Sequence, residues 1–451
     1  MVFSIALTVS QFKRNWTELV SEESVDELCR KLGYHWRNRL LPPGKTLQLF
    51  LLQVLHGNTA LSCLPHIAKM RFTSSALCQA KQRLPLEMLD SLLKRLSDGI
   101  EKEEFADGTW CGHRVFLLDG SAFSMPDTEE LQQYFPQSKN QKAGCGFPTA
   151  KLLGLFHCET RMIREALPAP LKSHDLHHLA QIHSALMTND LLLADRGFCS
   201  YAHFALLIRS SMHAVTRMHQ SRIVRFQSAP GAPRSRSKGY LQSPNADWIK
   251  KLGHKDQIVC WHKPYARPRW MSEDEYEQIP NTITIRELEF DISPKGFRTQ
   301  RVVIATTLVD AEQYPKEKIE KLYFKRWQVE TNFRHLKTSM KMDVLQAKTY
   351  EGILKELAVF CILYNLVWLV IRHAAQANNT EPQHIGFLDA LRWLRFDGNA
   401  NTLRSILIIP RRPNRVEPRE LKRRGKPYKF LTIPRRIRKE ELSNSKTYAL
   451  T

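Results

Sequence analysis

The sequence predicts an α/β fold built on an open sheet, and three observations indicate it. Residues 115–119 (VFLLD) and 191–195 (LLLAD) are short apolar runs that end in Asp and precede a Gly-containing turn. Runs of this length bounded by turn signals are typical of strands buried on both faces. Helical patterns at 174–187 and 200–211 flank the second run. A carboxylate at a strand's end projects into the crevice where such sheets bind ligands, so Asp119 and Asp195 are candidate site residues.

The remaining elements are predicted in order along the chain. Residues 1–110 are mostly helical, with apolar positions at helical spacing in 46–55 and 86–97, and Pro42 and Pro43 separate two helices. The Ser-, Pro-, Gly- and Arg-rich stretch 218–245 is typical of a loop leading into an insert. The predicted strands are 113–126, two strands within 151–168 about a turn near Glu159 and Thr160, 191–195, 213–217, the alternating run 283–291, and 301–307.

A helix with a charged stripe is predicted at KLYFKRWQVETNFRHLK, residues 321–337. At about 100° per residue, Tyr323, Arg326, Glu330 and Lys337 fall within a sector of roughly 60° on one face. A carboxylate beside two cations and a phenol suits phosphate chemistry, in which the carboxylate holds a metal and the cations hold phosphates. The alternative is an amphipathic helix whose charges are simply solvated.

Asp119, Asp195 and Glu330 together would form a cluster of three carboxylates. Three uncompensated carboxylates repel one another, so their pKa values would rise unless divalent cations lay between them. Hard oxygen ligands favour Mg²⁺ or Mn²⁺, and two such ions about 4 Å apart can promote phosphodiester cleavage.

With these residues in place, the chain resembles a bacterial insertion-sequence DDE transposase of the Y-(2)-R-(3)-E-(6)-K group, the insertion-sequence-four type. Tyr323, Arg326, Glu330 and Lys337 match that spacing in full. The other matching motifs are Asp119-Gly-Ser with MPDT at 125–128, Asp195-Arg-Gly-Phe, and the leader RNRLLPPGKTLQLFLLQVLHGNTALSCL followed by SALCQAKQRLP. The resemblance runs from about residue 25 to about residue 440 and is weakest in 218–300.

The resemblance implies a ribonuclease-H-like catalytic core interrupted by a mainly β insertion, with a helical N-terminal domain and a basic C-terminal region. The expected boundaries are 1–112 for a helical N-terminal DNA-binding domain, 113–217 and 301–375 for the two parts of the core, 218–300 for the insertion, and 376–451 for the basic C-terminal region.

The resemblance also implies an activity. Asp119, Asp195 and Glu330 would hold two Mg²⁺ or Mn²⁺ ions, and Arg326 and Lys337 would contact phosphates near the cut, with Tyr323 supporting that end. Cleavage at the element's ends and strand transfer into target DNA would follow a cut-and-paste route with a hairpin intermediate. The implied partners are double-stranded DNA with terminal inverted repeats, target DNA and a second copy of the chain on paired ends.

The charge of the chain favours a polyanionic partner, since the net charge is +22 and the pI is about 9.7. Residues 217–269 carry 12 Lys and Arg against 2 acidic residues, and residues 411–446 carry 14 against 4. Two separate basic segments suit a protein that contacts phosphates over a long duplex footprint. The alternative is a basic protein whose charged runs are only solvated.

The cysteines and apolar segments suggest a cytoplasmic protein. The 9 cysteines include no CxxC pair, so neither a disulfide framework nor a common zinc module is indicated. The start of the chain lacks a basic region before its apolar residues, so no signal peptide is predicted. The apolar run 357–371 includes Tyr364 and Asn365 and is shorter than about 18 residues, which favours a buried helix over a membrane span.

Several motifs are given their plainer interpretation. His174, His177, His178 and His183 share a predicted helix, but without a partner Glu or Cys we expect surface or capping roles rather than zinc binding. Ser121 is interpreted as a turn residue because no local base accompanies it.

The aromatic residue that the resembling group uses to fill the space of a flipped base has no counterpart here, because residues 299–303 read TQRVV. Trp248, Trp261, Trp270 and Phe297 remain candidates for that role, although each is more typical of a core residue.

Two further functions remain open from the sequence. One is a catalytically inactive regulator that only binds the element's ends, and the other is a metal-dependent nuclease on the same core that performs no strand transfer.

Overall fold

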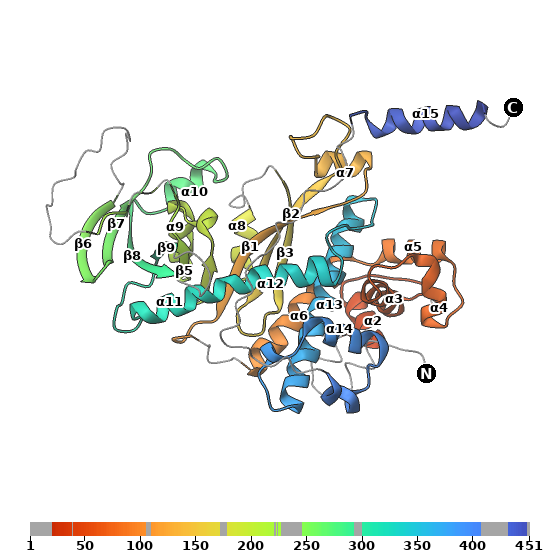
Figure 1. Cartoon of the computed structure of the whole chain (residues 1–451), viewed down its shortest axis with the longest axis horizontal. Helices are drawn as coiled ribbons and strands as arrows, with labels where there is room; N and C mark the ends of the chain where they lie inside the picture. Colours follow the sequence, from red (N-terminus) through yellow and green to blue (C-terminus); the bar gives the residue numbers. More distant parts are fainter. Residues whose placement is uncertain are drawn as a thin grey trace, which may run out of the picture.

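One nine-stranded sheet runs through the molecule in the order β3-β2-β1-β4-β5-β9-β8-β7-β6 (Figure 1). In this computed structural model the described residues are 20–37, 39–104, 110–171, 178–220, 222, 224–226, 246–292, 300–406 and 432–448. The strands are β1 (Val115–Ser124), β2 (Thr149–His157), β3 (Ile163–Pro170), β4 (Leu191–Ala194), β5 (His213–Arg217), β6 (Ala246–Gly253), β7 (Asp256–His262), β8 (Thr282–Ile292) and β9 (Gln300–Thr306).

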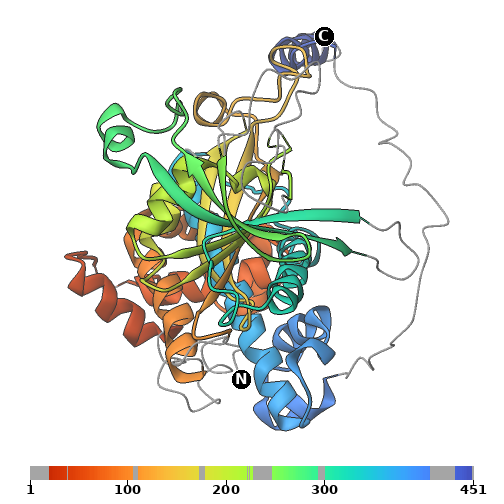
Figure 2. The same ribbon diagram turned by 90° about the vertical axis from the view of Figure 1, so that its left-hand side faces the viewer.

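Helices cover both faces of this sheet, as the view in Figure 2 shows for the twisted strands at its centre. The α-helices are α2 (Glu22–Lys31), α3 (Pro43–Leu55), α4 (Leu64–Ala68), α5 (Ser74–Arg83), α6 (Leu86–Glu104), α7 (Glu129–Tyr134), α8 (Leu179–Ser184), α9 (Tyr201–Arg209), α10 (Glu273–Gln278), α11 (Lys316–Phe324), α12 (Gln328–Arg334), α13 (Tyr350–Ala377), α14 (Phe387–Phe396) and α15 (Arg435–Tyr448). The predicted α/β class is therefore confirmed, and the described residues before 105 form helices joined by turns and loops, with no strand among them.

The central strands have the arrangement of a ribonuclease-H-like core. Strands β1, β4 and β5 are parallel neighbours, while β2 and β3 add antiparallel strands on the other side of β1. The predicted pair of strands within 151–168 corresponds to β2 and β3, which join through a turn that includes Glu159 and Thr160. The crevice outside the carboxyl ends of the parallel strands is where open sheets of this kind hold a site.

The strands of the predicted insertion continue the same sheet rather than forming a second one. The strand β9 pairs antiparallel with β5, and β8, β7 and β6 follow in turn, each antiparallel to its neighbour. The predicted strand 283–291 lies within β8, and the predicted strand 301–307 corresponds to β9. Much of the predicted entry loop 218–245 lies outside the described residues.

The predicted strand 113–126 is confirmed by β1, whereas the turn predicted directly after Asp119 is wrong. Strand β1 continues to Ser124, and Gly120 and Ser121 pair with Leu153 and Leu152 of β2. The chain stays extended here because β2 keeps supplying antiparallel hydrogen-bond partners beyond the point where β4 ends. Ser121 is therefore a strand residue, and Asp119 lies within a strand that has lost its neighbour on one side.

Alternate residues of the central strands face two separate apolar cores. Val115 and Leu117 of β1 belong to the core on the side of α6, α12 and α13, whereas Phe116 and Leu118 belong to the core with α8 and α9. This explains why the predicted strands read as continuous apolar runs rather than as alternating ones.

The long apolar helix is buried within the protein, as the sequence predicted for 357–371. Helix α13 is 28 residues long and packs against α3, α6 and β3. Among the described residues it is the one helix long and apolar enough to span a membrane by length and composition, yet 94% of its apolar window is buried. Tyr364 and Asn365, the polar residues noted in the apolar run 357–371, are both satisfied, because Asn365 bonds the backbone of Ile163 and the Tyr364 hydroxyl donates to the carbonyl of Arg161.

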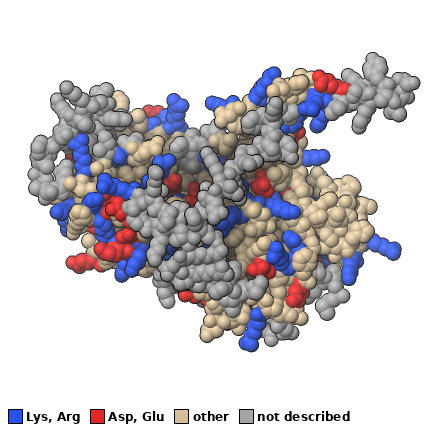
Figure 3. Space-filling model, in the orientation of Figure 1, with Lys and Arg blue, Asp and Glu red and all other residues tan. Residues whose placement is uncertain are grey.

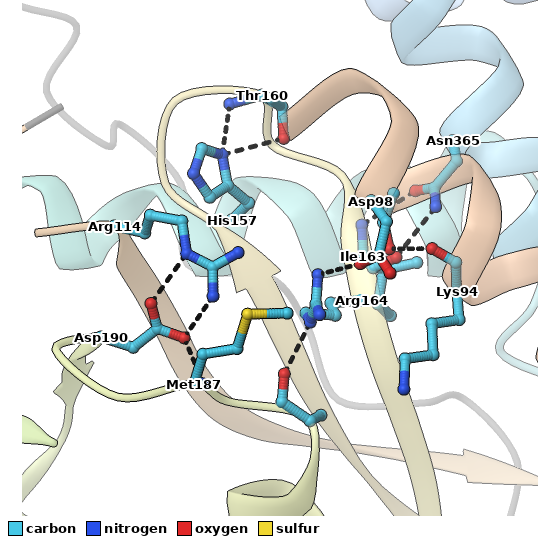
Figure 4. A network of polar contacts seen from close by, with 12 residues as sticks. Lys94, Asp98, Arg114, His157, Thr160, Ile163, Arg164, Met187, Asp190 and Asn365 are labelled. Atoms are coloured by element: carbon cyan, nitrogen blue, oxygen red, sulfur yellow. Dashed lines mark hydrogen bonds and ion pairs between the residues drawn. The ribbon is translucent and has the colours of Figure 1, made fainter. Parts of the chain in front are cut away.

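A network of polar contacts fixes the strands at the lower edge of the core (Figure 4). Arg114 donates two hydrogen bonds to Asp190, at 2.8 and 2.7 Å, and so joins the starts of β1 and β4. Arg164 of β3 donates to the Ala185 carbonyl and to Asp98 of α6. Arg114 binds one carboxylate with two hydrogen bonds, and Arg164 binds two different partners. Both arginines therefore hold the strands in position rather than bind ligands.

Candidate active site

Three charged residues lie in one row across the parallel strands. In register, Leu118 of β1 pairs with Ala194 of β4, and Ala194 pairs with Thr216 of β5. Asp119, Asp195 and Arg217 are the next residues after Leu118, Ala194 and Thr216, respectively. Two carboxylates and a guanidinium therefore occupy equivalent positions on adjacent segments. Neighbouring strands lie about 4.8 Å apart, which brings the two predicted aspartates together.

The row faces the helix that carries the third predicted carboxylate. Side chains alternate along a strand, so Asp119 shares the face of Val115 and Leu117, which is the face covered by α12. Figure 1 shows α11 and α12 running across the strands on this side. Glu330 lies on α12, and its side chain is 55% exposed. The sheet and the helix therefore present their carboxylates to a common space.

Arg326 joins two of the three carboxylates. Its guanidinium lies 3.9 Å from an Asp119 carboxylate oxygen and 3.5 Å from one of Glu330. The side chain is only 10% exposed, and its Nε has no hydrogen-bond partner in the described structure. A buried guanidinium with an unused donor can still engage a phosphate oxygen when a substrate arrives.

Asp119 is held in an environment that opposes its charge. Burial is the main cause that raises the pKa of Asp119 to about 6 from its ordinary value of 3.8, and the nearby charges of Asp195 and Glu330 add to it. A hydrogen bond of 2.7 Å from the Gly120 backbone N–H and the charge of Arg326 act in the opposite direction. This is the signature expected of clustered carboxylates that a cation would relieve.

Tyr323 forms the floor of the site beside Arg326. The residue is buried, the Arg326 guanidinium carbon lies 5.9 Å from the centre of its ring, and its ring meets Phe290 of β8 edge-on with centroids 6.2 Å apart. Burial raises the pKa of Tyr323 to about 12, and Asp195 adds to this effect while Arg326 and Arg217 oppose it. The phenol is therefore neutral at physiological pH.

The helical segment is not the regular α-helix that the sequence predicted. Between α11 and α12 the chain forms a 3₁₀ turn at Lys325–Trp327, and a π-helical turn follows at His335–Ser339. These turns change the rotation per residue, so the predicted 60° sector does not carry over to Lys337. Lys337 is half-buried in the π turn, and no ion pair within 4 Å joins it to the three carboxylates.

The described residues contain no preformed cluster of three His, Cys, Asp or Glu side chains that could hold a metal ion. The positive charge between Asp119 and Glu330 is that of Arg326. The donor set nevertheless suits a hard divalent cation, because all three groups are carboxylates and Asp119 is disfavoured as a bare anion.

The histidine motif lies mostly apart from any site chemistry. His174 and His177 are outside the described residues. His183 stacks on His203 with centroids 5.1 Å apart, and burial lowers the pKa of His183 to about 3. His183 is therefore a half-buried, neutral residue rather than the surface or capping residue that the sequence predicted. The described part of the predicted helix 174–187 is the short α8.

The candidate aromatic residues of the insertion differ in exposure. Trp261 is fully buried and donates a 3.1 Å hydrogen bond to Glu287, which makes it a core residue. Trp248 and Trp270 are half-buried, and Phe297 lies outside the described residues. Tyr265, which the sequence reasoning did not consider, is fully exposed in the loop after β7, and Trp327 beside Arg326 is 44% exposed.

Arg217 is the site residue that sequence reasoning missed. A weak signal was present, because HAVTR at 213–217 is a predicted strand that ends in a charged residue, as VFLLD and LLLAD do, although only Ala214 and Val215 in it are apolar. Only the parallel register of β4 and β5 shows that this end lies level with Asp195.

Comparison with known proteins gives a class to this arrangement. Residues 110–366 match the family model of the transposase DDE domain, which covers more than half of the chain and includes all of the carboxylates described above. The chain therefore belongs to the DDE transposase family.

Two individual proteins refine the comparison. The transposase InsG for insertion sequence element IS4 of Escherichia coli (strain K12) is 23% identical over 382 residues, which are 80% of this chain and 79% of that protein. The chain is thus similar to an IS4 transposase along most of both lengths, in line with the resemblance that its motifs indicate. A solved structure of the piggyBac transposase synaptic complex with hairpin DNA aligns with a TM-score of 0.40 and 10% identity, over 90% of this chain and 82% of that one.

Proposed function

We propose that this transposase cuts DNA at the ends of its own insertion sequence and joins those ends to target DNA, with Asp119, Asp195 and Glu330 as its catalytic carboxylates. The proposal is based mainly on one observation. Asp119 of β1 and Asp195, directly after the neighbouring strand β4, face Glu330 of α12. Arg326 lies within ion-pair distance of both Asp119 and Glu330. Transposases bind DNA, and members of this family generally use divalent metal ions. We also propose that the protein acts on DNA in the cytoplasm.

Two divalent cations, Mg²⁺ or Mn²⁺, held by the three carboxylates would supply Lewis-acid and nucleophile activation for phosphodiester cleavage. Asp119 and Asp195 extend from rigid neighbouring strands, so their spacing is fixed by the sheet. Glu330 is more exposed and lies on a helix interrupted by two irregular turns, which makes it the adjustable member of the set.

The remaining residues of the site bind and orient DNA. In the first reaction water attacks a phosphorus atom at the element's end, and the 3′-oxygen of the broken P–O bond leaves with a proton. That 3′-hydroxyl then attacks a second phosphorus, first on the opposite strand to give a hairpin and later, once reopened, in target DNA. Arg326 would exchange its carboxylate partners for a phosphate near the cut, Lys337 would hold a neighbouring phosphate, and neutral Tyr323 would support the end.

The sequence-specific partner is duplex DNA bearing the element's terminal inverted repeats, and two copies of the chain would act on paired ends. The half-buried Arg217 adds a cation to the same row, next to Tyr323. Its place favours a phosphate contact at the level of Asp195.

The test is cleavage of an end-containing duplex with Mg²⁺. The variants Asp119→Ala, Asp195→Ala and Glu330→Ala should each abolish nicking while leaving end binding largely intact. Glu317→Ala is the matched control, because Glu317 is exposed on the preceding helix, roughly 20 Å along the axis from Glu330. A variant that nicks at nearly the parent rate would remove that residue from the active site.

Product analysis separates this function from its alternatives. A parent protein that binds ends but never nicks them would be a regulator, and one that nicks without joining ends to target DNA would be a nuclease. The proposed function requires joined products.

A further inference from the structure

The guanidinium of Arg326 is paired more loosely than that of Arg286, another buried arginine. Arg286 donates to the two oxygens of Asp256 at 2.8 and 2.5 Å. Arg326 lies 3.9 Å from Asp119 and 3.5 Å from Glu330, beyond the length of about 2.7–2.9 Å that is typical of a charge-assisted hydrogen bond. Arg326 is therefore attracted to two carboxylates without being fixed to either one.

Two aromatic rings help to hold this guanidinium in place. Its carbon lies 5.9 Å from the centre of the Tyr323 ring and 5.0 Å from the centre of the Trp327 ring. Such contacts attract the positive charge without fixing the direction of each N–H group. Tyr323 is buried and Trp327 is 44% exposed, so the guanidinium lies at the boundary between core and solvent. It can therefore turn its N–H groups toward a new anion while it stays beside the two rings.

In this position Arg326 competes with a divalent cation for the same carboxylates. Its positive charge lies within ion-pair distance of Asp119 and Glu330, and like charges at this separation repel strongly where water is largely excluded. On the face drawn in Figure 3, acidic and basic side chains lie side by side over α11, so no uniform negative surface attracts a cation there. We therefore expect the free protein to bind metal ions weakly.

The carboxylates would attract a cation more strongly if Arg326 turned away. Burial raises the pKa of Asp119 to about 6 even with Arg326 beside it, so the charge of this carboxylate is only partly compensated. Without the guanidinium, neither Asp119 nor Glu330 has a cation within 4 Å in the described structure. A phosphate that draws Arg326 away therefore raises the affinity of the carboxylates for a divalent cation.

We propose that Arg326 is an internal counter-cation, which lowers the affinity of the three carboxylates for divalent cations until a DNA phosphate draws it away. This inference rests on the proposed function, because Arg326 needs a phosphate near the cut as its new partner. The unused Nε–H of Arg326 can take part in such a bidentate contact. DNA binding and metal binding then strengthen each other reciprocally. The site becomes competent for cleavage only on DNA that has reached Arg326.

A purely structural role for Arg326 predicts the opposite effect on metal binding. If Arg326 only held α12 against the sheet, a neutral replacement would loosen the carboxylates and weaken the binding of a divalent cation. If Arg326 is a counter-cation, the same replacement removes a competing positive charge and tightens that binding. The sign of the change in metal affinity therefore separates the two roles.

The experiment measures Mn²⁺ binding to the full-length protein, by a titration that follows the electron paramagnetic resonance of the unbound ion. Without DNA, Arg326→Gln should bind Mn²⁺ about 5- to 150-fold more tightly than the parent, the usual range of coupling between two sites. Arg326→Lys keeps the positive charge and should bind Mn²⁺ nearly as weakly as the parent. Arg209→Gln is the matched control and should behave like the parent, because Arg209 is exposed at the end of α9, on the other face of the sheet.

A second titration adds a saturating duplex that ends at the last base pair of the element encoding this chain, so that no flanking strand is left to cut. The Mn²⁺ held by the site is the difference between the parent and Asp119→Ala with the same duplex. The duplex should tighten this binding in the parent, and by a smaller factor in Arg326→Gln. Arg326→Met takes the place of Arg326→Gln if tryptophan fluorescence shows that the Gln variant does not fold.

The outcomes separate this inference from the proposed function. Equal or weaker Mn²⁺ binding in the folded neutral variant, compared with the free parent, would overturn the inference. So would Arg326→Lys or Arg209→Gln if it bound Mn²⁺ as tightly as Arg326→Gln. In each of these cases, Mg²⁺-dependent nicking of an end by the parent would leave the proposed function standing. A parent that bound no Mn²⁺ even with the duplex and never nicked an end would overturn both.

Discussion

Replacing Asp119 by Asn should stabilise the metal-free protein at neutral pH. The folded protein raises the pKa of Asp119 from 3.8 to about 6, chiefly by burial, so the ionised carboxylate is less favourable in the folded state than in the unfolded state. This corresponds to about 3 kcal/mol of lost stability. For a carboxyl group whose folded pKa is raised, stability is lost as the pH rises from about 4 to about 6, and the full loss is present above that window. Asn keeps an oxygen that can accept from the Gly120 N–H, but it carries no charge.

Urea unfolding in EDTA, followed by tryptophan fluorescence, measures the free energy of unfolding of parent and variant. At pH 7.5 Asp119→Asn should be more stable by up to about 3 kcal/mol, a value that already includes the attraction to Arg326, and at pH 4 by only about 0.5 kcal/mol. The control Asp291→Asn, at an exposed position on β8, should change stability by less than about 0.5 kcal/mol at either pH. Millimolar Mg²⁺ should then stabilise the parent more than Asp119→Asn, because the variant has lost a ligand.

The reasoning would be refuted if Asp119→Asn were no more stable than the parent at pH 7.5, or if its advantage were the same at pH 4. The first result would mean that Arg326 and the Gly120 N–H already compensate the charge. The second would mean that the gain comes from packing rather than from ionisation.

Three other changes test the surrounding residues. Arg326→Ala should process a pre-nicked end much more slowly than the parent while binding it nearly as well, and Arg326→Lys should also be deficient because Lys cannot clamp a phosphate bidentately. A parent-like time course of nicked, hairpin and joined products would exclude this role. Lys337→Ala is tested in the same way. Arg217→Ala should reduce the salt slope of end binding by about 1 and slow cleavage, whereas an unchanged slope would make Arg217 a structural residue only. Removing the residues after about 410 should weaken DNA binding and reduce the slope of its salt dependence by about 0.9 for each lost phosphate contact. A folded truncation with the parent slope would show that the tail only packs on the core. Arg435 already makes such a contact, because its guanidinium carbon lies 3.7 Å from the centre of the Phe147 ring.

The sequence determined the class of fold because its strongest patterns are local. The runs ending at Asp119 and Asp195 are apolar throughout, and strands buried on both faces require that composition wherever they lie in a fold. The apolar run 357–371 likewise predicted a core helix, since no exposed helix tolerates such a surface. The Tyr323, Arg326 and Glu330 spacing placed three side chains on one helical segment for the same local reason.

Tertiary structure alone decided how these segments combine. Arg217 lies beside Asp195 because of the register between β4 and β5, and no local sequence pattern encodes that register. The continuation of β1 beyond Asp119 depends on β2, whose hydrogen bonds keep the Gly-Ser sequence extended where it otherwise favours a turn. The irregular turns before and after α12 separate Lys337 from the regular stripe. The sequence by itself therefore determined which residues can carry the chemistry, because residue type and local period are written in the chain. Pairing between distant segments decided which of them meet, because register and packing are properties of the folded whole.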